Sequence, residues 1–176
     1  MKIGINLILV LTQLSLFISC GSDFKGELSI HYELKEFDLP SVVWLEDADN
    51  NYLKTLMVAD WLSYDGHRDS LVCPNWSQEA NWGNVSKEEL DAVTMATPDI
   101  NKHKIVLNIK KEKLEPGLYY YLVQTHVEDE YNILYKGKIN IGEKYDSTVA
   151  SVNYIPKKNP DSTMADLLCN VYAVIK

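Results

Sequence analysis

Short runs in which hydrophobic and polar residues alternate dominate the chain. In the segment 26–35 every second residue is hydrophobic, namely Leu28, Ile30, Tyr32 and Leu34. Segment 104–110 repeats the pattern with Ile105, Leu107 and Ile109. Because successive side chains of a strand point to opposite faces of a sheet, this pattern predicts strands that bury one face.

Further hydrophobic runs of strand length are separated by turn-forming residues. The runs lie at 41–47, 52–59, 115–128, 131–142, 149–156 and 167–176. The turn signals include Asp-Ala-Asp-Asn-Asn at 47–51 and Pro-Gly at 116–117, whose residues stabilise reversals of the chain. About eight strands at this spacing predict an all-β fold, an antiparallel two-sheet sandwich.

Only the segment 86–93 has a helical pattern. Ser86 is a suitable N-cap, and Glu89 lies three residues further on, where it can complete a capping box. Before this helix, residues 60–85 form a long irregular connection that contains four large aromatic residues, Trp61, Tyr64, Trp76 and Trp82. Two interpretations are open: a lid over one end of the sandwich, or a stacking platform for a flavin or sugar ring.

The N-terminal residues have the features of an export signal. A short basic start at Lys2 precedes an apolar run at 3–18, which is shorter than the roughly 20 residues of a membrane span. The run ends in Ser19-Cys20, which resembles a bacterial lipobox, although an ordinary secretory signal is the alternative. We therefore predict a lipoprotein signal over 1–19 and a lipidated Cys20.

The mature chain is predicted to be one folded domain in the bacterial cell envelope. Small and polar residues at 20–25 suit a tether, and 26–176 is long enough to bury a core. The formal net charge of -8 argues against binding to nucleic acid through charge. Cys73 and Cys169 could form a disulfide after export, or they could be free buried thiols.

Few other residues suggest chemistry. The four histidines are scattered, and no catalytic triad or phosphate-binding glycine loop is present. Asp47 and Asp49, with Glu46, could bind calcium, but turn-stabilising side-chain bonds are the favoured role. Three Asp-Ser pairs resemble a sequon for O-glycosylation of exported bacterial proteins, with Ser70, Ser147 and Ser162 as the candidate acceptors.

Three segments together resemble one bacterial family of exported proteins. These are VVWLEDADNNYLKTL at 42–56, DAVTMATP at 91–98 and LEPGLYYYLVQT at 114–125. In order and spacing they are similar to the family of domains of unknown function numbered 2271, over roughly residues 26–155. The resemblance implies an Ig-like β-sandwich with one short helix and a long Trp-rich loop.

The middle segment also resembles the acceptor sequence of a flavin transferase, which attaches FMN to exported redox proteins through a phosphodiester bond. The residues that match that sequence are Asp91, Ala92, Thr94, Ala96 and Thr97, and Thr97 would be the acceptor. Met95 departs from the pattern, which has glycine there, and glycine permits a closer approach of the backbone. The residue-level alternative is that Thr97 only marks the exit of the capped helix, since Pro98 disfavours helical geometry before it.

Two functional hypotheses follow. The first is a membrane-anchored accessory module of a flavin-linked electron-transfer system, with covalent FMN on Thr97 and with a flavin transferase and membrane electron-transfer proteins as partners. Such a module would carry electrons and would not be a stand-alone enzyme. The second is a non-catalytic binding or adhesion module that recognises a protein or glycan through exposed aromatic residues of 60–85.

Overall fold

The structure, a computed structural model, describes residues 26–128, 131–142, 144–155 and 166–176. The predicted signal at 1–19, the lipidation residue Cys20, the tether and the candidate acceptor Ser162 lie outside the described residues. No helix in the described part is long and apolar enough to cross a membrane.

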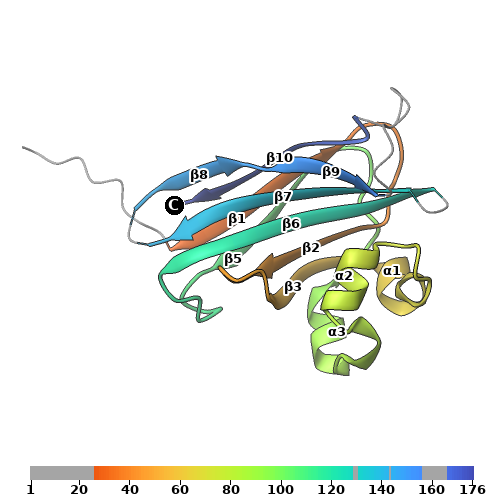
Figure 1. Cartoon of the computed structure of the whole chain (residues 1–176), viewed down its shortest axis with the longest axis horizontal. Coiled ribbons are helices and arrows are strands. Elements are labelled where there is room, and N and C mark those ends of the chain that lie inside the picture. The colour runs from red at the N-terminus through yellow and green to blue at the C-terminus, as the bar shows by residue number, and fades with distance from the viewer. Residues whose placement is uncertain (1–25, 129–130, 143, 156–165) are drawn as a thin grey trace, which may run out of the picture.

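Two β-sheets lie face to face (Figure 1). The four-stranded sheet has the order β5 (Lys102–Asn108), β1 (Glu27–Leu34), β10 (Leu168–Ile175), β8 (Asp146–Val149). The six-stranded sheet has the order β4 (Thr94–Met95), β3 (Tyr52–Ala59), β2 (Ser41–Glu46), β6 (Gly117–Glu128), β7 (Tyr131–Ile141), β9 (Ser151–Ile155). The prediction of a mostly β, sandwich-like fold is therefore confirmed.

The alternating pattern sets the register between strands. Ile30 of β1 lies opposite Ile105 of β5 and Ala173 of β10, so their side chains share one face. The expected all-antiparallel arrangement is wrong at one edge, because the two-residue strand β4 pairs in parallel with Val58 and Ala59 of β3. This pairing is parallel because residues 60–93 cross back along the sheet before β4 begins, as βαβ-type connections do.

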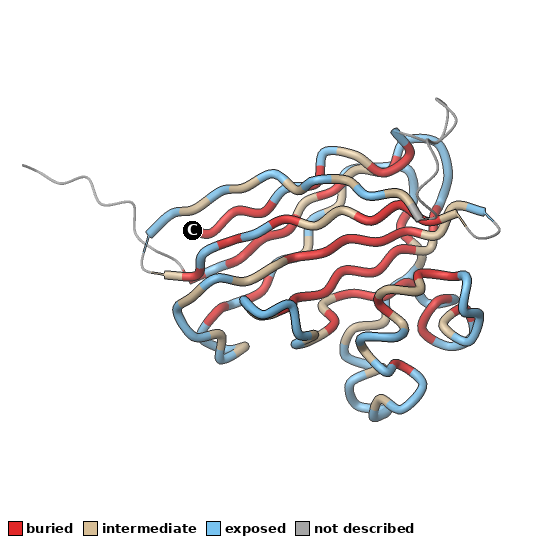
Figure 2. The backbone as a smooth tube through the Cα atoms, in the orientation of Figure 1, coloured by how far each residue is buried: buried red, intermediate tan, exposed pale blue. Residues whose placement is uncertain are grey.

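The main core lies between the sheets and contains the hydrophobic side of each alternating strand (Figure 2). Leu28, Ile30, Val43, Val123 and Ile133 are fully buried there. Burying an aliphatic side chain of this size contributes about 1.5–3 kcal/mol relative to leaving it in water. The sandwich is thus held together chiefly by its two inner faces.

A layer of short helices covers the outer face of the six-stranded sheet (Figure 1). It comprises α1 (Asp60–Tyr64), η1 (Gly66–Arg68), α2 (Pro74–Glu79), η2 (Trp82–Asn84) and α3 (Lys87–Val93). The expectation of a single helix after a long loop is wrong. Helices of five or six residues span fewer than two turns, so no 3.6-residue pattern can be recognised in their sequence.

This layer contains a second core, which explains why every residue of β2 is buried. Trp44 and Val42 of β2 pack there with Leu62, Trp76 and Trp82 from the helical layer. Trp76 and Trp82 therefore form part of a lid, as one interpretation held, but the lid covers a sheet face rather than the end of the sandwich. Trp61 and Tyr64 differ, because they are 46% and 48% exposed.

Two local predictions can be compared with the structure. The Ser86 Oγ accepts a hydrogen bond from the Glu89 amide at 3.1 Å, which confirms the N-cap of α3. Asp47 Oδ1 accepts hydrogen bonds from the amides of Asp49 and Asn51, both at 2.9 Å, as a turn-stabilising aspartate does. The side-chain bond from Asn51 is the main reason that the pKa of Asp47 is lowered.

The disulfide between Cys73 and Cys169 is not formed, and both thiols are free. Cys73 is buried beneath the helical layer, whereas Cys169 belongs to β10 of the other sheet. Burial raises the pKa of the Cys73 thiol, so this thiol remains protonated.

Candidate functional site

The segment that contains Thr97 begins at a well-fixed helix end. After α3, the Thr94 hydroxyl donates a hydrogen bond to the Leu90 carbonyl oxygen at 2.6 Å. Thr94 and Met95 then pair with β3. From Ala96 the chain leaves regular structure until β5, so the candidate acceptor lies on an irregular segment that is held at both ends by strands.

Thr97 is flanked by accessible residues. Ala96 and Met95 are exposed, Thr97 is half-buried and Pro98 is buried. The buried proline fixes the position of the segment, while the small Ala96 leaves the approach to Thr97 open. Within the described part of the chain, the Thr97 hydroxyl makes no hydrogen bond. It is thus a free alcohol at the surface.

A cavity of about 340 Å³ lies beside Thr97. Small-molecule sites typically have volumes of about 300–1,000 Å³, so this cavity is at the lower end of that range. Met95, Ala96, Thr97, Pro98 and Asp99 form one side, and Tyr32, Met57, His103, Lys104 and Ile105 form the remainder. Residues from β1, β3 and β5 therefore meet the irregular segment at one place.

The rings of Tyr32 and His103 stack within this lining, with centroids 5.0 Å apart and planes 26° apart. The His103 Nε2–H donates to the Asp99 carbonyl oxygen at 2.9 Å, which fixes the orientation of the imidazole. Burial raises the pKa of Tyr32, so its phenol is neutral at physiological pH. The cavity thus has the half-buried His103 ring, backed by the buried Tyr32 ring, next to the free Thr97 hydroxyl.

The structure brings together only part of the predicted motif. Ala96 and Thr97 line the cavity, but Asp91 and Thr94 do not. Asp91 is exposed on α3, and the Thr94 hydroxyl is already bonded within the helix. Tyr32 and His103 had no signal in the sequence, because Tyr32 comes from β1, far from Thr97 in the chain, and only the pairing of β1 with β5 places it beside His103.

A second polar cluster, which the sequence did not indicate, lies beneath α2. Glu46 is buried and accepts a hydrogen bond from Trp44 Nε1 at 3.1 Å and another from the Lys136 ammonium group. The pKa of Glu79 is raised to about 7, first by burial and then by its hydrogen bond and charge contact with Glu46. A protonated Glu79 can donate to the Glu46 carboxylate, so this cluster ties α2 to the sheet.

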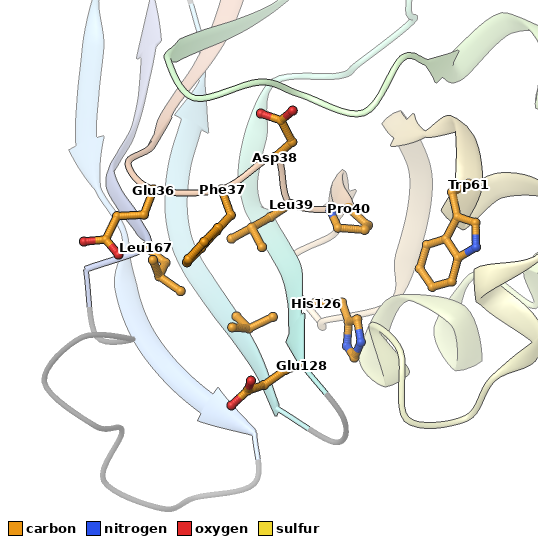
Figure 3. Close-up of a pocket in the computed structure, with 10 residues that line it drawn as sticks. Glu36, Phe37, Asp38, Leu39, Pro40, Trp61, His126, Glu128 and Leu167 are labelled. Carbon is orange, nitrogen blue, oxygen red and sulfur yellow. The ribbon is translucent and has the colours of Figure 1, made fainter.

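A larger cleft of about 730 Å³ lies at one end of the sandwich, where β2 begins and β6 ends (Figure 3). Phe37 and Trp61 line it and are 59% and 46% exposed. Gly66 lies against the Trp61 ring, since a Cβ at Gly66 would be 2.7 Å from Trp61 Cζ3. The absence of a side chain at Gly66 therefore lets the indole lie flat against the backbone.

The remaining candidate residues concern glycosylation and metal binding. Ser70 and Ser147 are exposed, so both are accessible to a glycosyltransferase. Within residues 26–128, 131–142, 144–155 and 166–176, no three His, Cys, Asp or Glu side chains are grouped so that they could hold a metal ion.

Comparison with known proteins gives one family. The family model described as "Predicted periplasmic protein (DUF2271)" matches residues 31–156. This range includes the segment around Thr97, the whole helical layer and every strand from β2 to β9. Neither a curated protein nor a solved structure matches the chain.

Proposed function

This chain belongs to the DUF2271 family of predicted periplasmic proteins, and we propose that it carries covalent FMN on Thr97. In this proposal an Ig-like sandwich presents the flavin as an accessory module of an extracytoplasmic electron-transfer system. A flavin transferase would load it, and membrane electron-transfer proteins would exchange electrons with it. The flavin supplies the redox chemistry, and the protein supplies its position and shielding.

One observation carries the proposal: the Thr97 hydroxyl is free of hydrogen bonds and lies beside a cavity of small-molecule size. An acceptor alcohol must be reached by a second protein, and the exposed Ala96 next to it leaves room for that approach. The half-buried His103 ring, which stacks on the buried Tyr32 ring, provides an aromatic group against which a flat ring system can pack.

The modification transfers the FMN group from FAD to the Thr97 hydroxyl. The Thr97 oxygen attacks the phosphorus of the FMN half of FAD and forms a phosphodiester bond. The pyrophosphate bond of FAD breaks, and AMP leaves after accepting the hydroxyl proton. The protein therefore gains the mass of FMN less one water.

Met95 is compatible with this proposal in the folded protein. It belongs to β4 and pairs with Ala59, an extended conformation that any residue can adopt. Its side chain is 53% exposed and lines the cavity. Methionine in place of the motif's glycine therefore hinders access to Thr97 sterically but does not strain the backbone. A smaller residue at this position should make Thr97 easier to reach.

We expect yellow protein when the chain is exported from cells that also express a flavin transferase. The colour should survive denaturation because the bond is covalent, and the intact mass should show the FMN adduct. Thr97→Ala should abolish both signals, because the attacking oxygen is lost. Ser151→Ala is the matched control and should remain yellow, because Ser151 is an exposed hydroxyl residue of β9 that lies outside the acceptor segment and does not line the cavity.

Met95→Gly should raise the fraction of flavinylated protein in the same cells. Colourless wild-type and Met95→Gly proteins, obtained where a known acceptor becomes yellow, would refute the flavin proposal. Modification of Thr97→Ala at the wild-type level would equally refute Thr97 as the acceptor.

The second element of the proposal is a lipid anchor on Cys20, motivated by the Ser19-Cys20 lipobox after an apolar run. A labelled fatty-acid analogue should be incorporated into the wild-type protein and not into Cys20→Ala. The variant should also pass from the membrane fraction to the periplasmic extract, because acyl chains provide the attachment. Equal labelling of both proteins would exclude Cys20 as the acylated residue.

A binding or adhesion module is the second candidate function. It is favoured by the exposed rings of Trp61 and Tyr64 on α1, since solvent-exposed aromatic residues are common in recognition surfaces. Trp76 and Trp82 cannot contribute to such a surface, because they are buried in the second core. This function would lead if the flavin experiments fail.

A further inference from the structure

The cleft at the end of the sandwich has two aromatic walls and an apolar floor. Figure 3 shows Phe37 on the segment before β2 and Trp61 on α1, with Leu39 and Pro40 between them. Leu167, which directly precedes β10, lies beside Phe37 and adds to the apolar lining. The cleft volume of about 730 Å³ is within the range of small-molecule sites, and two of its largest side chains are left exposed.

Among the described residues that line the cleft, the charged side chains are all acidic. Glu36, Asp38 and Glu128 contribute three carboxylates, which Figure 3 places around the rim. No lysine or arginine belongs to the described lining. The described lining also contains the imidazole of His126, whose Nδ1 lies 3.3 Å from Asn132 Oδ1.

The aromatic walls and the carboxylates both attract a bound cation. The face of an indole or phenyl ring is electron-rich and attracts a cation placed over it. Carboxylates at a low-dielectric rim attract the same charge and repel anions. The apolar floor, in turn, favours a ligand with an apolar or aromatic body.

We propose that this cleft binds a small organic cation in which a positively charged head group is joined to an apolar or aromatic body. The body packs on Leu39, Pro40 and the aromatic rings, and the head group faces the carboxylates. The cleft shares no lining residue with the cavity beside Thr97. The site therefore does not depend on flavin, and each proposal can fail without the other.

Benzamidine and benzamide provide a matched pair of probes, because they have nearly the same shape and only benzamidine is charged at neutral pH. Each would be titrated into the mature protein while the NMR signals of the Leu39 and Leu167 methyl groups are followed. At low ionic strength we expect benzamidine to bind at least about fivefold more tightly than benzamide. Added salt should reduce this ratio, because rim charges are screened.

Substitutions identify the groups responsible. Trp61→Ala and Glu128→Gln should each weaken benzamidine binding about threefold or more, and Glu128→Gln should leave benzamide binding unchanged. Tyr64→Ala is the control for ring removal, since Tyr64 is exposed on the same helix and does not line the cleft. Glu88→Gln on α3 is the control for charge removal, and neither control should alter binding.

Three results would overturn the proposal. Equal affinity for the two probes would show that the carboxylates do not select a cation. No methyl shift with benzamidine at millimolar concentration would show that the cleft is not a binding site. Shifts that persist unchanged in both Trp61→Ala and Glu128→Gln, with far-UV circular dichroism like the wild type, would place the binding elsewhere.

Discussion

Trp76→Ala is expected to lower the free energy of unfolding by about 3–5 kcal/mol, the usual cost of truncating a buried tryptophan. Trp76 is fully buried between α2 and the outer face of the six-stranded sheet. Its indole packs on Trp82, with ring centroids 4.7 Å apart, and its Nε1–H donates to Thr55 Oγ1 at 2.9 Å. The variant loses both contacts and leaves a cavity that helices this short cannot close.

Loss of Trp76 should also loosen the helical layer before the sandwich unfolds. The Trp76 amide donates to Gln124 Oε1 at 3.3 Å, so the backbone of this residue joins α2 to β6 while its side chain joins α2 to β3. Urea unfolding followed by circular dichroism measures the total loss, and hydrogen exchange compares amides of the layer with those of β6. Faster exchange should be largest in α2 and in η2.

Trp61→Ala is the matched control for this experiment. Trp61 lies in the same layer but is 46% exposed, so its truncation should cost well under half as much. A Trp76→Ala protein as stable as Trp61→Ala would contradict the role of Trp76 in the second core.

Gly137→Ala is expected to cost about 1–3 kcal/mol, the usual effect of overpacking a core. Gly137 lies directly opposite Tyr121 in the pairing of β6 with β7. A Cβ at Gly137 would be 2.2 Å from Tyr121 Cζ, so the ring would have to move. The ring is fully buried, and its hydroxyl donates to the Thr148 carbonyl oxygen at 2.8 Å, so a shift also weakens this link to β8.

A double-mutant cycle with Tyr121→Ala tests this explanation. Once the ring is removed, Gly137→Ala should cost almost nothing, so the two changes should be strongly non-additive. Gly142→Ala is the control, because a Cβ there meets no atom within 4 Å. The same cost for Gly137→Ala with and without Tyr121 would show that contact with the ring is not the cause.

Much of the fold could be predicted from local patterns. The alternation in β1 and β5 placed Ile30 and Ile105 on an inner face, and both pack in or against the main core. The cap at Ser86 and the turn around Asp47 were correct because these interactions involve residues within four positions of each other. The chain's family was likewise indicated by three contiguous segments and is confirmed by the match over residues 31–156.

Only the part of the candidate site that is contiguous in the sequence could be predicted. Thr97 and Ala96 belong to one short motif, but the rings of Tyr32 and His103 reach them through the pairing of β1 with β5. The Glu46 cluster arises in the same way, since Lys136 and Glu79 come from a distant strand and from a helix too short to predict.

By itself, the sequence determined most of the strands, although not the short β4 and β8, as well as several turns, one helix cap and the family of the chain. These features depend on the periodicity of neighbouring residues and on hydrogen bonds within a few positions. Only the tertiary structure decided that Trp76 and Trp82 are core residues while Trp61 is exposed. The three tryptophans of this connection differ in burial because each packs against whatever part of the sheet lies opposite it. Sheet pairing brings together residues that are far apart in the chain, so this burial cannot be read from the local sequence.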